Sequence, residues 1–474
     1  MRKYAIPTLN KIILISSFLF FFAFPGMAQI NLIPNTEDCS STRAPFAFSI
    51  TRKWVSSTNN DINCNTSPLS ADIDNDGNVE VFVLGRNTQG PDSYCIHIFD
   101  GATGAEVGKI APGVKIAGYI WTGNNFLICD VDKNGRGEVF IATAGGKGYL
   151  YEVNAGGRPL TFTEKWGGKT IPANNASPVV ADLDGNGDVE FVVGNYVLDH
   201  NGNTIGTMAY KGLTTGWGNV EFPVVADLDN DKKAEIIVGT NVYKYNGTSL
   251  SLWRTCPTLT QQEGSNMVAD VNQDGYVDVV FHSYANGTNT STGYSYNGTI
   301  TVWTPALNQT VGTVVTLNGQ RSYPFVGDID GVVINGKKYP EICVNTAGKL
   351  YAYTYNGSSF SQKWSMTHSD ASGGTALTLF DFNLDGVVEL VYRDQTYIQI
   401  FDGSGTTPNL LYRSFCGSET GAETPIIADV TGDGSADIIV TGHPSNANSS
   451  TGEVIVFEGG DSKWASAPST WNQQ

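Results

Sequence analysis

Eight short acidic segments place carboxylates at alternate positions of the chain. In the first, Asp72, Asp74, Asp76 and Glu80 stand at positions 1, 3, 5 and 9, with Gly77 at position 6. Alternate side chains of a tight loop can converge on one point, and glycine at the sixth position permits the sharp turn. Ca²⁺ takes six to eight hard oxygen ligands, whereas Mg²⁺ prefers a smaller octahedral shell with retained water. The spacing therefore predicts a calcium site in this loop.

The same spacing recurs seven more times, and the leading acids are about 51 residues apart on average, a period typical of a propeller or a solenoid. The expected ligands, loop by loop, are Asp72, Asp74, Asp76, Asn78 and Glu80; Asp130, Asp132, Asn134 and Glu138; Asp182, Asp184, Asn186 and Glu190; Asp227, Asp229, Asp231 and Glu235; Asp270, Asn272, Asp274 and Asp278; Asp328, Asp330 and Glu341; Asp381, Asn383, Asp385 and Glu389; and Asp429, Thr431, Asp433 and Asp437. Ordinary polar turns do not explain eight copies at one place in a repeat, so we expect about six to eight bound Ca²⁺ ions.

The loops are not all equivalent. The fourth has Lys232 where glycine is expected, and the sixth inserts residues between Asp330 and Glu341, so the occupancy of these two loops stays open. The third position is neutral in the fifth, seventh and eighth loops, which carry Asn272, Asn383 and Thr431. Fewer charges weaken a calcium site. None of the loops is an EF-hand, whose last acid stands at position 12 and whose flanks are helices.

Each acidic loop lies between strand-like segments. A short apolar stretch precedes it, and a β-branched run such as 235–238 follows it. A third segment alternates aromatic residues, as in 350–353, and ends in a hairpin-type pair such as Asn356-Gly357. A fourth segment often ends in tryptophan, as at Trp364. Each repeat is therefore predicted to be a four-stranded antiparallel meander, and no long stretch has helical periodicity.

The second segment of each repeat is apolar on both sides, which indicates a strand buried on both faces. Sheets stacked around an axis produce this pattern, whereas a two-sheet sandwich would show cleaner alternation. The sequence therefore predicts an all-β fold: a single β-propeller of about eight four-stranded blades, with the calcium loops between the first two strands. Seven blades, or a linear solenoid, are the alternatives.

The two ends of the repeat array are complementary. The segment 46–54 has the form of a fourth strand ending in tryptophan, yet it precedes the first acidic loop, and the last repeat stops after its third strand at 454–457. We predict that the N-terminal strand completes the last blade and closes the ring.

The first residues are predicted to be a secretory signal peptide. Arg2, Lys3 and Lys11 precede an apolar run at 12–24, and a small-residue site ends at Ala28. A membrane anchor is the alternative, but the run is shorter than the roughly 20 residues that spanning requires. The expected organisation is a signal peptide at 1–28, a leader at 29–45, a propeller at 46–460 and a tail at 461–474. Without a later apolar segment, the mature chain is expected outside the cell or at its surface, with the periplasm as the alternative.

The formal net charge of −18 argues against a nucleic-acid partner, because phosphates attract basic surfaces. More than half of the 46 acidic residues belong to the loops, so the charge is organised and suits cations. The seven cysteines show no metal-binding spacing. Cys129 and Cys343 lie in strand-like runs and are predicted to be buried, and a disulfide among Cys39, Cys64 and Cys95 stays open.

Over roughly residues 46–460 the repeats resemble the FG-GAP/VCBS family of calcium-loop propeller repeats, also found in integrin α-subunit heads. The resemblance rests on the loop pattern, led by Asp72, Asp74, Asp76 and Glu80. It implies calcium loops on one face of the propeller and ligand contacts on the other. The tail at 467–473 is similar to a segment that follows such propellers in surface proteins of Bacteroidota, which implies truncation before a further module.

The favoured function is a glycan- or protein-binding adhesion module at the cell surface. The connections between blades contain five candidate ligand contacts, Tyr119, Trp121, Trp217, Glu221 and His368. Aromatic rings near a polar rim can stack on sugars; the alternative is that they plug the ends of the blades.

An enzyme is the less favoured alternative. Rhamnogalacturonan lyases are similar propellers that use Ca²⁺ beside a basic residue, but the chain has no Gly-x-Ser-x-Gly, His-Glu-x-x-His or P-loop motif, and its five histidines are scattered. A third reading is a scaffold within a larger surface protein.

Overall fold

The computed structural model describes residues 47–473, except 59–60, 87–94, 112–115, 117–124, 144, 172–176, 210–212, 216–217, 221–222, 260–263, 285–287, 291–292, 296–297, 317–322, 422 and 461–462. The regular secondary structure of these residues is entirely β-strand. Accordingly, no helix among them has the length and apolar character needed to cross a membrane.

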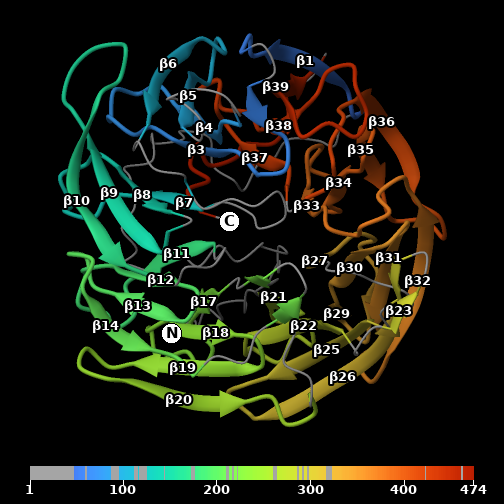
Figure 1. Ribbon diagram of the computed structural model, residues 1–474. Coiled ribbons are helices and arrows are strands. Elements are labelled where there is room, and N and C mark those ends of the chain that lie inside the picture. The colour runs from blue at the N-terminus through green and yellow to red at the C-terminus, as the bar shows by residue number, and fades with distance from the viewer. Residues whose placement is uncertain are drawn as a thin grey trace, which may run out of the picture.

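Eight four-stranded antiparallel sheets form a ring of blades, as predicted (Figure 1). Blades 1 to 4 are β3 (Leu69–Ala71), β4 (Glu80–Leu84), β5 (Ile96–Asp100) and β6 (Glu106–Ile110); β7 (Phe126–Cys129), β8 (Glu138–Ala142), β9 (Lys147–Val153) and β10 (Phe162–Thr170); β11 (Pro178–Ala181), β12 (Glu190–Val193), β13 (Tyr196–Leu198) and β14 (Thr204–Thr207); and β17 (Val224–Ala226), β18 (Glu235–Val238), β19 (Asn241–Tyr245) and β20 (Leu250–Thr255).

Blades 5 to 8 are β21 (Gly264–Ala269), β22 (Asp278–Tyr284), β25 (Gly298–Thr304) and β26 (Gln309–Thr316); β27 (Pro324–Gly327), β30 (Glu341–Thr346), β31 (Lys349–Tyr355) and β32 (Phe360–Thr367); β33 (Leu377–Phe380), β34 (Glu389–Arg393), β35 (Tyr397–Asp402) and β36 (Asn409–Phe415); and β37 (Ile426–Ala428), β38 (Asp437–Gly442), β39 (Thr451–Gly459) and β1 (Ile50–Val55). Short extra pairs are β15 (Leu213–Thr215) with β16 (Gly218–Val220), β23 (Thr288–Thr290) with β24 (Gly293–Ser295), β28 (Val333–Ile334) with β29 (Lys337–Lys338), and β2 (Ile62–Asn63) with β39.

The second strand of each blade packs against both neighbouring blades. In β4, Phe82 and Leu84 join an apolar cluster with blade 2, whereas Val81 and Val83 join one with blade 8. Within the described residues there is one such cluster at each of the eight blade interfaces. Since each fully buried aliphatic side chain stabilises the fold by about 1.5–3 kcal/mol, these interfaces hold the ring together. The two-sided burial read from the sequence is confirmed.

The N-terminal strand closes the ring, as the sequence predicts. β1 pairs with β39 in antiparallel register, from Ile50 opposite Gly459 to Val55 opposite Ile455. The indole Nε1 of Trp54 then donates a hydrogen bond to Gly101 O in the next blade, over 2.7 Å. Equivalent tryptophans on β10 and β32 bond to turns of blades 3 and 7. The recurring tryptophan therefore locks one blade to the next.

The C-terminal tail lies inside the fold, on the inner strands of the ring (Figure 1). Trp471 exchanges two backbone hydrogen bonds of 2.9 Å with Ser70 on β3. Ile128 N on β7 donates to Asn472 O, and Val180 N on β11 donates to the Gln473 side chain. The tail thus satisfies inner-strand backbone groups of blades 1, 2 and 3.

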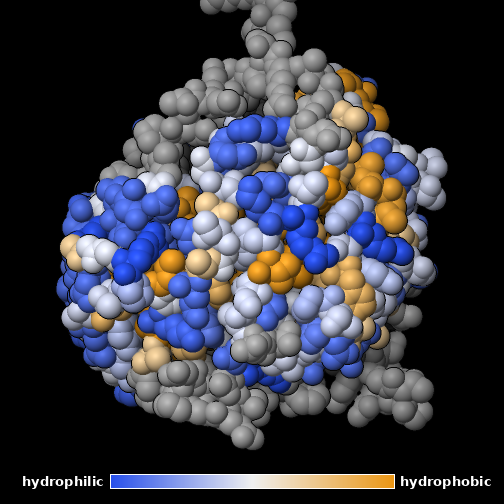
Figure 2. Space-filling model, turned by 90° about the horizontal axis from the view of Figure 1, so that it is seen from above, coloured by the Kyte–Doolittle hydropathy of each residue, from blue (hydrophilic) through white to orange (hydrophobic). Residues whose placement is uncertain are grey.

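The outer surface and the thiols are unremarkable for a folded β-protein. In the view of Figure 2, hydrophobic residues form small patches separated by hydrophilic ones. Cys129 and Cys343 are buried, as predicted, and neither Cys64 nor Cys95 forms a disulfide with another described cysteine. Cys39 lies outside the described residues.

Candidate metal sites

All eight acidic loops connect the first and second strands of a blade. In the first loop, Asp72 directly follows β3 and Glu80 is the first residue of β4. The same holds in the other blades, where the last acid of the loop always begins the second strand. Because the blades share one orientation around the ring, the eight loops lie on a common rim.

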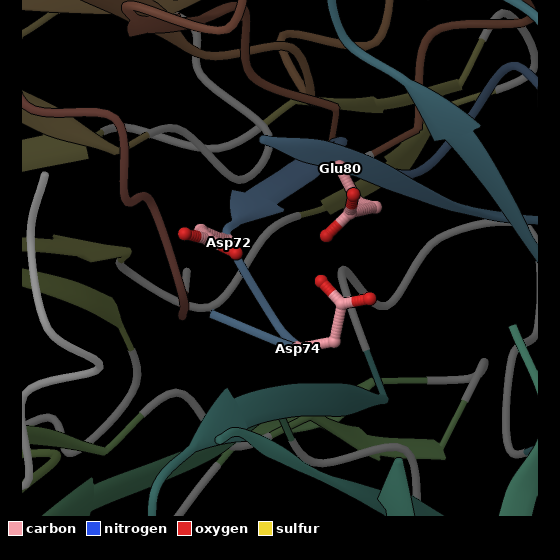
Figure 3. A group of neighbouring side chains, drawn as sticks. All are labelled: Asp72, Asp74 and Glu80. Atoms are coloured by element: carbon pink, nitrogen blue, oxygen red, sulfur yellow. The ribbon is translucent and has the colours of Figure 1, made fainter. Parts of the chain in front are cut away.

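Backbone hydrogen bonds shape each loop around its acids. In the first loop, the carboxylate of Asp72 accepts the N–H groups of Asp76 and Gly77, each over 3.0 Å. Glu80 Oε2 accepts the N–H of Ile73 over 3.1 Å. Gly77 has a φ of 91°, so the sharp turn requires glycine there. The carboxylates of Asp72, Asp74 and Glu80 then point toward a common space (Figure 3).

The bond to the last acid recurs in every loop and holds its carboxylate in place. The donors are the N–H groups of Ile73, Val131, Leu183, Leu228, Val271, Ile329, Phe382 and Val430, and the acceptors are Glu80, Glu138, Glu190, Glu235, Asp278, Glu341, Glu389 and Asp437. In five loops, ligand atoms of three acids lie within 4.8 Å of one another. These triads are Asp72, Asp74 and Glu80; Asp130, Asp132 and Glu138; Asp182, Asp184 and Glu190; Asp227, Asp229 and Glu235; and Asp328, Asp330 and Glu341.

Burial raises the pKa of every last acid. The pKa values rise to about 8 for Glu80, Glu341 and Glu389, and to about 7 for Glu138, Glu190, Glu235, Asp278 and Asp437. In each case the largest cause is loss of hydration, which disfavours the charged carboxylate. A cation held among these oxygens would restore the charged form.

Several loop oxygens have no hydrogen-bond partner among the described residues. Asp437 is 1% exposed, and its Oδ1 accepts no hydrogen bond from them. Oδ1 of Asp74 is likewise buried and unbonded. A buried carboxylate oxygen of this kind is costly unless a donor or a metal ion satisfies it. The hard oxygen donors and their free lone pairs fit Ca²⁺.

Basic side chains contact expected ligands in five of the loops, which the sequence reasoning missed. In loop 1, Arg158 lies 3.2 Å from Asp76 and 2.5 Å from Glu80. In loop 2, Lys165 lies 2.5 Å from Asp132 and 3.3 Å from Glu138. The corresponding contacts of loops 4 and 6 are Lys244 to Asp229, Asp231 and Glu235, and Lys363 to Asp330 with Lys338 to Asp328. In loop 8, Lys463 lies 3.6 Å from Asp433.

A sequence signal for two of these cations existed. Lys165 and Lys363 each directly precede a blade-locking tryptophan on the fourth strand, in the pairs 165–166 and 363–364. That position turns toward the acidic loop of its own blade. The lysine–tryptophan pair is therefore a recognisable element of the repeat.

Of the candidate ligand contacts on the opposite rim, Tyr119, Trp121, Trp217 and Glu221 lie outside the described residues. His368 follows β32, at the end of blade 6 away from the acidic loops. Its ring centroid is 5.1 Å from that of Tyr392, and its Nδ1 accepts the N–H of Asp370 over 3.1 Å. Burial lowers the pKa of His368. A ligand role for these five residues stays a prediction.

Comparison with known proteins gives a family signature and a fold likeness. The model of the FG-GAP-like repeat matches residues 130–193 and 334–392. No curated protein matches the sequence.

Among solved structures, the biofilm matrix protein Bap1 of V. cholerae has a TM-score of 0.62 at 13% identity, with 90% of this chain and 94% of that chain covered. A rhamnogalacturonan lyase of Bacillus licheniformis has a TM-score of 0.39 at 15% identity, with 87% and 74% covered. The TM-score of 0.39 is too low to carry an argument. The likeness to Bap1, at 13% identity, concerns the fold alone. The chain contains FG-GAP-like repeats carried on an eight-bladed β-propeller.

Proposed function

We propose that the chain is an exported calcium-binding propeller that binds a glycan or a protein at the cell surface. The observation that carries the calcium part is the common rim, on which carboxylate triads converge within 4.8 Å at the same place in successive blades. Loop 3 supports it best, because Asp182, Asp184 and Glu190 have no lysine or arginine ion partner among the described residues.

Bound Ca²⁺ would act first as a structural ion. It would neutralise acids that otherwise repel one another and would pin the loop between the first two strands. An ion that binds only the folded chain adds about 2.7 kcal/mol per site at a hundredfold excess over its Kd. Several such sites would stiffen the rim and leave the opposite rim as the surface for a ligand.

The binding role draws on three supports. The acidic chain disfavours nucleic acid, the N-terminal 28 residues have the form of a signal peptide, and the fold resembles that of a biofilm matrix protein. Matrix and surface proteins work outside the cell, where free calcium is abundant. We therefore place the ligand among surface glycans and proteins.

Two measurements test this proposal. Elemental analysis of the purified chain after dialysis against calcium should find several ions per molecule; one ion or none would refute the calcium role. A glycan array and a surface-protein pull-down, each with and without calcium, should give calcium-dependent binding. A parallel lyase assay on rhamnogalacturonan should give no unsaturated sugar ends, and their appearance would replace the binding module with a lyase.

A further inference from the structure

Loop 4 differs from the other loops in how its charge is balanced. The ammonium of Lys244 lies 2.7 Å from Asp229, 2.9 Å from Asp231 and 3.0 Å from Glu235. These acids stand at positions 3, 5 and 9, which are the positions expected to hold the metal. A lysine ammonium has three donors, and here three carboxylates accept them. The cation requirement of the loop is therefore met by the chain itself.

Lys244 is held in this place by its own blade. It lies on β19 and pairs with Ser251 on β20, so its backbone is fixed within the sheet. The centroid of the Trp253 ring lies 4.7 Å from the Nζ of Lys244, and the lysine side chain is only 26% exposed. Both the aromatic face and the carboxylates attract the ammonium. The contact is thus built from three elements: the loop, β19 and β20.

The position of Lys244 is acidic in other blades. The register of β18 and β19, with Ile236 opposite Tyr243, places Lys244 opposite Glu235 at the next pair. In blades 1, 2 and 7, the residue opposite the last acid is Asp100, Glu152 or Asp402. Like charges directly across a sheet destabilise it, and opposite charges stabilise it. Blade 4 therefore has a cross-strand ion pair where those three blades have two acids.

Loop 4 has also lost the glycine of the sharp turn. Lys232 stands at the sixth position with a φ of 70°, in the left-handed region that favours glycine. Its N–H still bonds to Asp227 over 2.8 Å, so the loop keeps its shape. Lys232 and Lys233 add two positive charges beside the four acids of the loop. The carboxylates of this loop match those of loop 1, but the three lysines beside them oppose the binding of a divalent ion.

We propose that Lys244 replaces the metal ion of blade 4, so that this blade is stabilised without calcium. The inference rests on the proposed calcium role of the remaining loops. Arg158 and Lys165 contact only two acids each in loops 1 and 2, and neither lies on the third strand of the blade whose loop it contacts. In blade 4, by contrast, the ammonium of Lys244 contacts all three acids at positions 3, 5 and 9 of the loop.

The test converts blade 4 to the pattern of its neighbours. The double variant Lys232→Gly/Lys244→Asp restores glycine at the turn and an acid opposite Glu235. The matched control is Lys232→Gly/Lys349→Asp, which makes the same charge change with the aspartate at an exposed third-strand position of blade 6 and leaves Lys244 in place. Bound calcium per folded chain is measured by elemental analysis. The double variant should bind one ion more than the wild type, and the control should bind the same number.

A site-specific readout locates the added ion. Tb³⁺ replaces Ca²⁺ and is sensitised by a nearby indole, so the double variant should gain terbium emission that a further Trp253→Phe change removes. Lys244→Met removes the ammonium without adding a ligand and serves as a second variant. Circular dichroism checks that each variant is folded.

The outcomes separate the two proposals. Calcium in the wild type with no additional ion in the folded double variant overturns the role of Lys244 and leaves the calcium propeller standing. No calcium in the wild type but one ion in the double variant supports the role of Lys244 and refutes calcium elsewhere. No ion in either protein overturns both.

Discussion

Blades 3 and 4 are neighbours that share one backbone design and differ in their source of positive charge. In both, the last acid accepts an N–H from the second loop position, over 2.9 Å at Glu190 and 2.7 Å at Glu235. In both, burial raises the pKa of that acid to about 7. Among the described residues of these two blades, only blade 4 places an ammonium among the acids at positions 3, 5 and 9 of its loop. The backbone of the repeat therefore fixes where the acids meet, and a single side chain on the third strand decides what neutralises them.

Removal of calcium should have the largest effect on this comparison. We expect a chelator to lower the melting temperature by tens of degrees, because several ions each contribute about 2.7 kcal/mol at a hundredfold excess over Kd. Hydrogen exchange should show loss of protection at Leu183 in blade 3, whereas Leu228 in blade 4 stays protected. The control is chelator with excess calcium. A melting temperature that neither chelator nor added calcium changes would contradict the calcium role.

Removing one expected metal ligand from blade 3 or from blade 4 should affect calcium binding differently. Asp184→Asn in blade 3 should remove one bound ion and, at saturating calcium, about 2–3 kcal/mol of stability. The equivalent Asp229→Asn in blade 4 should leave the number of bound ions unchanged. Calorimetric titration with calcium counts the sites in both variants. An equal loss of one ion from each would show that the two loops do not differ.

Loss of the ammonium should have a smaller effect in calcium-free protein. Lys244→Met leaves three acids without their donor, and we expect a loss of about 1–2 kcal/mol, below the cost of breaking a fully buried pair because the side chain is partly exposed. Urea unfolding in chelator measures the change. Lys349→Met, an exposed change on the third strand of blade 6, is the control and should be neutral. A neutral Lys244→Met would mean that the ammonium does not stabilise blade 4.

The stability of the calcium-free protein should also depend on pH. The last acids have a folded-state pKa of about 7 or 8, whereas the ordinary pKa of glutamate is 4.5. At pH values between these two, the folded chain therefore holds more protons than the unfolded chain. Stability should therefore fall as the pH rises from about 4.5 to about 8. Urea unfolding at pH 5 and pH 8 measures the slope, which Glu190→Gln should reduce. A stability that rises over this range in chelator would show that these acids are charged in the folded chain.

The order of the strands and the acidic loop within one repeat could be predicted from the sequence, because it depends on local spacing. Acids at positions 1, 3, 5 and 9 define the loop, glycine or an equivalent residue permits its turn, and the β-branched run after it forms the second strand. Burial of that run on both faces predicted the blades, and the fourth-strand form of 46–54 predicted the closure now seen between β1 and β39.

Contacts between distant segments were decided only by the tertiary structure. Arg158 comes from blade 2 yet binds Asp76 of loop 1, which lies 82 residues earlier. Trp471 pairs with Ser70, 401 residues away, although the tail reads locally as a polar segment. Lys244 looks like an ordinary strand lysine until the register of β18 and β19 sets it opposite Glu235. Local spacing fixes which groups each loop presents, but only packing of one blade against the next fixes which charges and backbone groups meet them.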